Sequence, residues 1–124
     1  GLWAIEEKAN SNFVGFVGLH EPSLELPFSP CVEIGWRLAR QYWGKGYATE
    51  AARESLNFAF GYLGLAKIFS FTSVYNLRSR AVMERIHMVN TKRNFEHPSI
   101  GVGHSLREHV LYELSREHWE KSAM

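Results

Sequence analysis

The sequence contains one cysteine, almost no net charge and no long hydrophobic run, and each of these features excludes a class of protein. Cys31 has no second cysteine to pair with, and no signal-peptide pattern is present, so we expect the protein to be cytoplasmic. A formal net charge of +1 is too small to attract nucleic acid. No segment is apolar over the roughly 20 residues that a membrane-spanning helix needs. We therefore expect neither a nucleic-acid partner nor a membrane partner.

The rest of the composition is typical of one folded domain. Hydrophobic residues make up 45% of the chain and charged residues 22%, which is ordinary usage for a globular protein. Splitting 124 residues would leave two cores too small to be stable. We predict a single domain over residues 1–124. Because the first residues already have the pattern of a strand, with no helix or cap before them, the chain begins as though in the middle of a domain.

Five runs of β-prone residues predict strands. They cover residues 2–7, 13–19, 32–39, 67–74 and 109–114. The turn-forming residues 8–12 join the first two runs and predict a hairpin. Residues 21–30 include three prolines, which remove backbone donors, and this segment is predicted to be a loop. Residues 88–106 are poorly patterned, and a charged tail follows the last predicted strand.

Two segments change to the period of a helix. After Tyr47, small and apolar residues recur along one stripe and predict a helix that packs closely on a sheet and ends at Gly64. Asn76 is typical of a helix N-cap and precedes a second apolar stripe. The stripe residues are Ala48, Ala51, Ala52, Ser55, Leu56, Ala59 and Leu63 in the first helix, and Leu77, Ala81, Val82 and Ile86 in the second. Because a strand, a helix and a strand follow in order, we predict parallel pairing of residues 32–39 with residues 67–74.

The segment between the third predicted strand and its helix has the chemistry of an anion site. Gly44 and Gly46 can expose backbone amides there without a Cβ in the way. At a helix N-terminus, free N–H groups and the positive end of the dipole attract phosphate. The alternative is that the two glycines only form a tight turn. The segment is neither a Walker A loop nor a Rossmann fingerprint, because it lacks a Ser or Thr after Lys45 and a third spaced glycine.

Gln41, Gly44 and Gly46 match the QxxGxG/A signature of the GNAT superfamily of N-acetyltransferases. They lie between a predicted strand and a predicted helix, where that family has its coenzyme A diphosphate loop. The wider runs of residues 32–39 and 42–51 resemble the RimJ/RimL branch of the family. The sequence is therefore identified as a GNAT-like member of that branch.

The helix after the fourth predicted strand extends the resemblance and also departs from it. Asn76 and Ser79, followed by residues 82–85, are similar to the family's helix at this place. His87 stands where the family usually has glycine, and histidine tolerates a positive φ better than most residues. The family's first strand and first two helices, which help to form the acceptor site, have no counterpart before Gly1. We expect an N-terminally truncated form of the family domain.

The resemblance implies an α+β fold of the α/β/α sandwich type, with a mixed, mostly antiparallel sheet, a central parallel strand pair and flanking helices. It implies that the parallel strands splay apart and that the pantetheine arm of acetyl-CoA lies between them. It also implies direct transfer of acetyl to a primary amine, either a protein N-terminal amine or a small-molecule amine, without a metal. The coenzyme-binding residues implied are Trp36, Leu38, Gln41, Gly44, Lys45, Gly46, Tyr47, Ala48, Thr49, Asn76, Ser79 and Arg85.

Two residues are candidates for the chemistry. Glu33 matches a strand carboxylate that many family members use as a base, directly or through water. It could equally be a strand-end charge that faces solvent or pairs with Arg37. Ser79 lies one helical turn after Asn76 and could donate to the departing sulfur, or it could be an exposed residue of the first turn.

Other functions compete with acetyl transfer. A non-catalytic acyl-CoA-binding or dimeric assembly module is the alternative, and in a homodimer a partner chain could replace the absent elements. Phe69, Phe71 and Tyr75 could form a stacking platform for RNA, although their alternation favours core packing. The histidines lack an HExxH arrangement and a cysteine cluster, so no metal site is expected. His97 lies in a loop that could close over the acceptor pocket.

Overall fold

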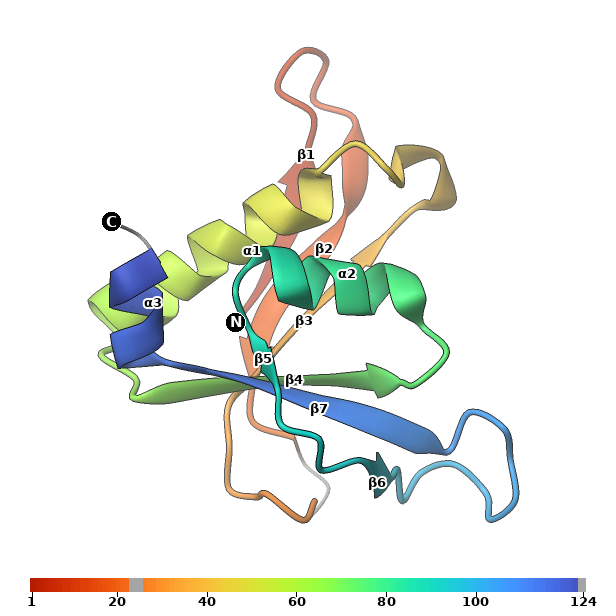
Figure 1. Cartoon of the computed structure of the whole chain (residues 1–124). Helices are drawn as coiled ribbons and strands as arrows, with labels where there is room; N and C mark the ends of the chain where they lie inside the picture. The colour runs from red at the N-terminus through yellow and green to blue at the C-terminus, as the bar shows by residue number, and fades with distance from the viewer. Residues whose placement is uncertain (23–25, 123–124) are drawn as a thin grey trace.

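The computed structural model describes residues 1–22 and 26–122, and the strands within that part form one seven-stranded sheet (Figure 1). Residues 23–25 of the predicted loop 21–30 lie outside the described residues. The strands are β1 (Leu2–Glu6), β2 (Phe13–His20), β3 (Glu33–Leu38), β4 (Lys67–Ser73), β5 (Val89–Asn90), β6 (Phe95–Glu96) and β7 (Glu108–Ser115). The helices are α1 (Tyr47–Asn57), α2 (Leu77–Arg85) and α3 (Arg116–Ser122), with a short 3₁₀ helix η1 (Arg40–Tyr42) and a π-helical turn η2 (Phe58–Tyr62).

The sheet is mixed and mostly antiparallel. Its order is β1-β2-β3-β4-β7-β5, and β6 also pairs with β7. β1 and β2 form the predicted hairpin, and β2 pairs with β3 in antiparallel register. β3 and β4 are the parallel pair, connected through α1. The predicted α+β fold class with a central parallel strand pair is therefore confirmed.

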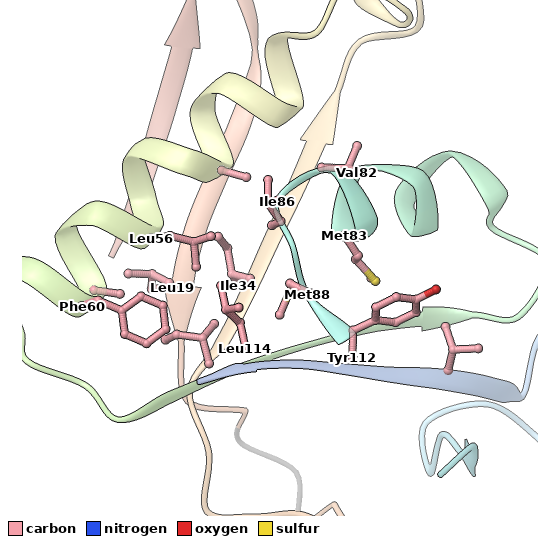
Figure 2. Packing of buried hydrophobic residues seen from close by; sticks show 14 residues of the cluster. Leu19, Ile34, Leu56, Phe60, Val82, Met83, Ile86, Met88, Tyr112 and Leu114 are labelled. Atoms are coloured by element: carbon pink, nitrogen blue, oxygen red, sulfur yellow. The ribbon is translucent and has the colours of Figure 1, made fainter. Parts of the chain in front are cut away.

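The main hydrophobic core lies between one face of the sheet and the helices. Leu56 of α1, Phe60 of η2, and Val82 and Met83 of α2 belong to one cluster with Ile34 of β3, and Met83 points toward Tyr112 of β7 (Figure 2). These side chains are buried. Burying a side chain of this size stabilises the fold by about 1.5 to 3 kcal/mol. This cluster therefore fixes α1 and α2 against the sheet and, with them, the segments that flank β3 and β4.

α1 ends in a wider turn that places two aromatic side chains in different contacts. The helical path becomes π-helical at Phe58 and stops at Gly64, where φ is +67°. Phe58 meets Trp3 edge-on with ring centroids 5.4 Å apart, and Phe60 stacks on Trp119 of α3 at 5.2 Å. A π turn inserts one residue into the helical register, so both phenylalanines reach a partner. The predicted stop at Gly64 is confirmed.

The end of α2 also follows the prediction. His87 has a φ of +70°, in the left-handed region that usually requires glycine. Its amide donates to the carbonyl of Glu84 at 3.1 Å, and the amide of Met88 donates to the carbonyl of Met83 at 3.0 Å. These bonds close the helix, so histidine fills this position without loss of the turn.

The structure corrects two residues of the predicted apolar stripes and adds elements where the sequence predicted none. Leu63, on the predicted stripe of the first helix, is 49% exposed. Leu77 is 70% exposed, because it begins α2 beyond the core, and Met83 faces the core instead. The charged tail forms helix α3. Trp119 packs against the core, and the charged side chains of the helix lie outside the core. The poorly patterned residues 88–106 contribute two short strands, β5 and β6, because β7 offers them backbone partners.

The opposite face of the sheet carries a smaller aromatic cluster. Phe69 and Phe71 of β4 lie 5.5 and 5.6 Å from Phe28, measured between ring centroids, and Phe95 lies 5.1 Å from the same ring. Tyr75 is separate from this cluster, follows β4 and is 68% exposed. Phe69 and Phe71 are thus occupied in packing, which their alternation favoured, and they do not form a platform with Tyr75.

Candidate active site

The parallel strands β3 and β4 separate after a short contact. Glu33 pairs with Phe69, whose amide donates to the carbonyl of Val32 at 3.0 Å. The last link is the hydroxyl of Ser70, which donates to the carbonyl of Ile34 at 2.9 Å. Within residues 1–22 and 26–122 the two strands form no further register pair, and Figure 1 shows β4 running across the direction of β3. The strands therefore enclose a wedge that opens after Ile34.

The edge of β3 that faces this wedge keeps free backbone groups. β2 pairs with the other edge along the whole of β3, and the amide of Ala39 donates to the carbonyl of Val14 on that side at 2.9 Å. Backbone groups alternate between the two edges of a strand, so those of Trp36 and Leu38 point into the wedge. The indole Nε1 of Trp43 donates to the Leu38 carbonyl at 3.1 Å. Both groups of Trp36 and the amide of Leu38 remain for an incoming molecule.

A cavity of about 440 Å³ occupies the wedge. β3 forms one wall, and β4 and α2 form the other. The lining combines polar groups at the vertex and at the first turn of α2 with apolar side chains of the core. The cavity therefore suits a molecule that has both polar and apolar surface. The lining residues are Glu33, Gly35, Trp36, Arg37, Leu38, Trp43, Ala48, Ser70, Phe71, Thr72, Asn76, Arg78, Ser79, Val82 and Met83.

The turn before α1 leaves its amides exposed. Gly44 and Gly46 have φ values of +78° and +80°, and a Cβ on either would meet no atom within 4 Å. The amide of Glu50 is the first to make a helical bond, at 3.0 Å from the carbonyl of Gly46. In the part of the chain that the structure describes, the amides of residues 44–49 donate to no acceptor. Free amides at the positive end of a helix are what an anion site needs.

A second hollow, a groove of about 670 Å³, lies beside this turn. Lys45, Arg53 and Arg85 bring positive charge to it, whereas Glu50 and Glu54 bring negative charge. Arg53 Nη2 donates to the carbonyl of Arg85 at 3.3 Å and so links α1 to the end of α2. The groove is also lined by Gly44, Gly46, Tyr47 and Thr49. An anion at the free amides would therefore have cationic side chains within the same groove.

Contacts with neighbouring side chains hold the turn in place. The hydroxyl of Tyr47 donates to Glu7 Oε2 at 2.6 Å, and this bond lowers the pKa of the Glu7 carboxyl. The ring centroids of Tyr47 and Tyr42 lie 6.2 Å apart. The ammonium of Lys45 lies 5.8 Å from the centroid of the Tyr42 ring. The turn is thus attached to the β1–β2 hairpin.

Trp43 and Arg78 meet at the mouth of the cavity. The guanidinium of Arg78, in the first turn of α2, lies 3.9 Å from the centroid of the Trp43 ring. Arg40 lies on the same ring at 5.7 Å. Because Trp43 also bonds to Leu38, one side chain connects β3, the turn before α1 and α2.

Glu33 lies at the vertex of the wedge and is only 8% exposed. Burial raises the pKa of its carboxyl from the ordinary 4.5 to about 8. Its Oε1 lies 3.0 Å from Nε2 of His20 on β2. The two side chains are therefore within hydrogen-bonding distance, and burial favours the neutral form of the Glu33 carboxyl. The structural alternatives are corrected accordingly: Glu33 does not face solvent, and its partner is His20, not Arg37.

Asn76 and Ser79 join the cavity from the start of α2. Asn76 is the predicted N-cap, since its Oδ1 accepts from the amide of Ser79 at 3.2 Å. Its Nδ2 donates to Thr72 Oγ1 at 3.1 Å and ties the cap to β4. Ser79 is half-buried, so it is not the fully exposed residue of the alternative interpretation. Both side chains line the wedge, as their one-turn spacing predicted.

The structure gathers nearly all the predicted residues around these two hollows. The cavity collects Glu33, Trp36, Leu38, Ala48, Asn76 and Ser79, and the groove collects Gly44, Lys45, Gly46, Tyr47, Thr49 and Arg85. Gln41 lies exposed in η1 and lines neither hollow. Sequence reasoning did not find His20, Ser70 or the pairing of Trp43 with Arg78. Only the register of β2 on β3 and the folding of α2 over the turn bring these residues to the site.

Neither a membrane span nor a metal centre is found in the described residues. No helix among them combines the length and the apolarity that crossing a bilayer requires. Across 1–22 and 26–122, no three or more His, Cys, Asp or Glu side chains are grouped so that they could hold a metal ion. The polar groups that line the site are backbone amides, the carbonyl of Trp36 and the side chains of Glu33, Asn76 and Ser79.

The wedge, the free edge of β3 and the glycine turn together define an acetyltransferase domain of the GNAT type. The family model described as "Acetyltransferase (GNAT) domain" matches residues 1–89, and the chain belongs to this family. The chain is 35% identical over 118 residues to the FsC-acetyl coenzyme A-N(2)-transacetylase of Aspergillus fumigatus, an alignment that covers 90% of this chain and 49% of that protein.

Solved structures agree with the family assignment. The acetyltransferase (GNAT family) from Bacillus anthracis superposes with a TM-score of 0.76 at 27% identity, covering 94% of this chain and 66% of that one. The ribosomal-protein-S5-alanine acetyltransferase from Vibrio fischeri has the same fold, with a TM-score of 0.76 at 19% identity, covering 95% of this chain and 62% of that one. The chain spans about half the length of the curated relatives it matches.

Proposed function

We propose that this chain binds acetyl-CoA and takes part in the transfer of its acetyl group to a primary amine. The observation that carries the proposal is the continuity of the site: free amides at the N-terminus of α1 adjoin a wedge whose β3 edge keeps unpaired groups at Trp36 and Leu38. A ligand with an anionic end and an extended arm rich in amides fits that arrangement. Membership of the GNAT family supports the choice of acetyl-CoA.

In this proposal, the groove binds the diphosphate of the coenzyme and the cavity binds its pantetheine arm. The amides of residues 44–49 are suited to the diphosphate, with Lys45 and Arg85 nearby to balance its charge. The free backbone groups of Trp36 and Leu38 are suited to the amides of the pantetheine arm, in the manner of a strand added to β3. Asn76 and Ser79 then lie at the thioester end of the wedge. Gln41 is retained from the family signature as a residue that shapes the turn.

Acetyl transfer needs a group that accepts the amine proton, a hydrogen-bond donor that stabilises the oxyanion, and a group that donates to the leaving sulfur. Acetyl-CoA supplies the thioester, and the amine nitrogen bonds to its carbonyl carbon as the carbon–sulfur bond breaks. Glu33, in its carboxylate form, takes one proton from the substrate ammonium, directly or through water, and the neutral amine then attacks. The second proton leaves the nitrogen as the carbon–sulfur bond breaks and ends on the thiolate, which gives the thiol of coenzyme A. A backbone amide of β3 stabilises the oxyanion, and the Ser79 hydroxyl donates to the sulfur. Because a thiol has a pKa near 8.5, the help needed from Ser79 is modest.

Calorimetric titration with acetyl-CoA tests the binding step. Wild type should bind, and Gly46→Glu should abolish binding because it places a carboxylate among the phosphates. Gly103→Glu is the matched control: Gly103 has a φ of +82° and open space around it, so it imposes the same backbone strain and charge away from the site. Unchanged affinity in Gly46→Glu, or equal loss in both variants, would contradict the assignment of the turn.

The acceptor is proposed to be a protein N-terminal amine or a small-molecule amine. Resemblance of residues 32–39 and 42–51 to the RimJ/RimL branch supports the first, and the name of the Aspergillus relative, an N(2)-transacetylase, supports N-acetyl transfer in general. A screen for thiol release from acetyl-CoA with polyamines, amino acids, aminoglycosides and peptide N-termini identifies the acceptor class. The reducing cytoplasm remains the proposed location on the basis of the single cysteine.

The alternative is a non-catalytic acyl-CoA-binding module that assembles as a homodimer. β1 is an edge strand, and a groove of about 830 Å³ lined by Trp3, Ile5 and Phe58 lies between it and α1. A second copy that paired its own β1 edge with this one would cover both. Acetyl-CoA binding without thiol release for every amine, together with a dimeric sedimentation profile, would favour this module. A monomer would count against it.

A further inference from the structure

The buried carboxyl of Glu33 has one polar side-chain partner among the residues that the structure describes, and that partner reaches the surface. Glu33 Oε1 lies 3.0 Å from Nε2 of His20. The Glu33 side chain is 11% exposed, whereas the His20 side chain is 59% exposed. The two residues are paired across β2 and β3 in the sheet register, so the contact is set by backbone geometry and does not depend on a loop.

This position matters because a buried base must dispose of each proton it takes. Glu33 lines the cavity on one side and contacts His20 on the other. The imidazole is therefore a bridge between the cavity and bulk water. Histidine suits this task because both of its ring nitrogens can carry or release a proton near neutral pH.

We infer that His20 is the positioning residue through which Glu33 exchanges its proton with solvent during acetyl transfer. The inference rests on the proposed function, because it needs Glu33 as the proton acceptor. One proton enters from the substrate ammonium at the Glu33 carboxylate. It passes from the carboxyl to Nε2 of His20, and the imidazolium releases one proton to water. The pair thus ends each turnover with the proton count at which it began.

Among the charged and titratable groups that the structure describes around Glu33, His20 is the one that can pass its proton to solvent. Arg37 lies on the same strand and Arg78 on α2, and both line the cavity, but neither can accept a proton at neutral pH. Cys31 is also nearby, and burial, followed by the charges of Glu33 and Glu21, raises the pKa of its thiol. The β4 residues at this point are Phe69 and Phe71, which do not titrate.

The test compares His20→Ala with His118→Ala, which removes an exposed histidine on α3 far from the site in the sequence and fold. Thiol release is followed with acetyl-CoA and the amine of the panel that wild type acetylates fastest. His20→Ala should lower kcat by roughly tenfold to a hundredfold, at the low end of acid–base effects, and leave the KM for acetyl-CoA unchanged. Added imidazole should restore part of the rate in this variant, and His118→Ala should behave as wild type.

A second readout needs no turnover. The ¹⁵N chemical shift of His20 Nε2 at pH 7 should move in Glu33→Gln, whereas that of His118 should stay in place. If wild type is active and His20→Ala has an unchanged kcat, the relay is overturned and the proposed function stands. The same holds if added imidazole does not restore the rate of His20→Ala. An unmoved His20 resonance in Glu33→Gln also overturns the relay. Absence of thiol release by wild type with every amine overturns the proposed function itself, and the relay with it.

Discussion

The hydroxyl of Ser70 donates to the carbonyl of Ile34 at 2.9 Å in a fully buried contact, and this bond lies where β3 and β4 part. In a regular parallel pair, the Ile34 carbonyl would accept from a backbone amide of β4. Here a side chain satisfies it, so the ladder can stop without leaving a buried acceptor unpaired. The wedge that holds the candidate site begins at this substitution of a side chain for a backbone donor.

Ser70→Ala should therefore destabilise the fold. The Ile34 carbonyl would lose its donor in a buried place, and a buried unsatisfied acceptor costs about 1 to 3 kcal/mol. Urea denaturation of Ser70→Ala against wild type measures the loss. Ser105→Ala, in an exposed loop, is the control and should change the free energy of unfolding by less than about 0.5 kcal/mol. Equal stability of Ser70→Ala and wild type would contradict this role.

Trp43 should contribute to acetyl-CoA affinity by holding the mouth of the cavity in its binding form. Trp43→Ala removes the ring under Arg78 and the donor to the Leu38 carbonyl. A stacked cation near the surface contributes about 0.5 to 1 kcal/mol, so Kd should rise about two- to fivefold. Trp43→Phe keeps a ring for Arg78 and should retain most of the affinity. Calorimetry that finds Trp43→Ala binding as tightly as wild type would contradict this.

Glu33 should make the fold less stable as pH rises. Its pKa is about 8 in the folded chain and near 4.5 when unfolded, so the folded state holds a proton that the unfolded state has lost between these values. The stabilisation is complete below pH 4.5 and is lost as pH rises toward and through 8, by about 5 kcal/mol at most.

Urea denaturation of wild type and Glu33→Gln between pH 5 and pH 9 isolates this effect. Wild type should lose stability relative to the variant as pH rises. His109 acts in the opposite sense, because burial lowers its pKa and its contribution is lost as pH falls, but it is present in both proteins and cancels. A stability difference that does not change with pH would show that Glu33 is ionised throughout.

The same carboxyl should control the pH profile of acetyl transfer. Only the carboxylate accepts a proton, so the ratio of the wild-type rate to the Glu33→Gln rate should rise with pH up to about 8 and then level off. Taking the ratio removes the ionisation of the amine, which is common to both proteins. Thiol-release rates from pH 6 to pH 9 measure it, and a flat ratio near one would exclude Glu33 as the base.

The sequence predicted the local parts of this site because their signals are local. Gly44 and Gly46 indicate a turn, and both have a positive φ in the structure. The stripe of small residues after Tyr47 indicates a closely packed helix. The parallel pairing follows from the order of elements alone. Asn76 was recognisable as a cap because capping needs only a side chain and the next turn of the same helix.

The rest of the site depends on contacts between distant segments. His20 reaches Glu33 only through the register of β2 on β3, and no short motif encodes that register. Arg78 reaches Trp43 because the start of α2 lies beside the turn before α1, and Leu77 is exposed because it begins the same helix beyond the core. Helix α3 was missed because a single apolar residue, Trp119, attaches it to the core.

The most direct measurement of the central claim is a ¹H–¹⁵N NMR titration of the chain with coenzyme A. If the free amides at the start of α1 hold the diphosphate and the open edge of β3 holds the arm, the largest shift changes should fall on residues 44–49, Trp36 and Leu38. The amides of β2 and β7, which are engaged in sheet pairing, should move little. Saturating coenzyme that leaves residues 44–49 unmoved, or that moves only the groove between β1 and α1, would contradict the account.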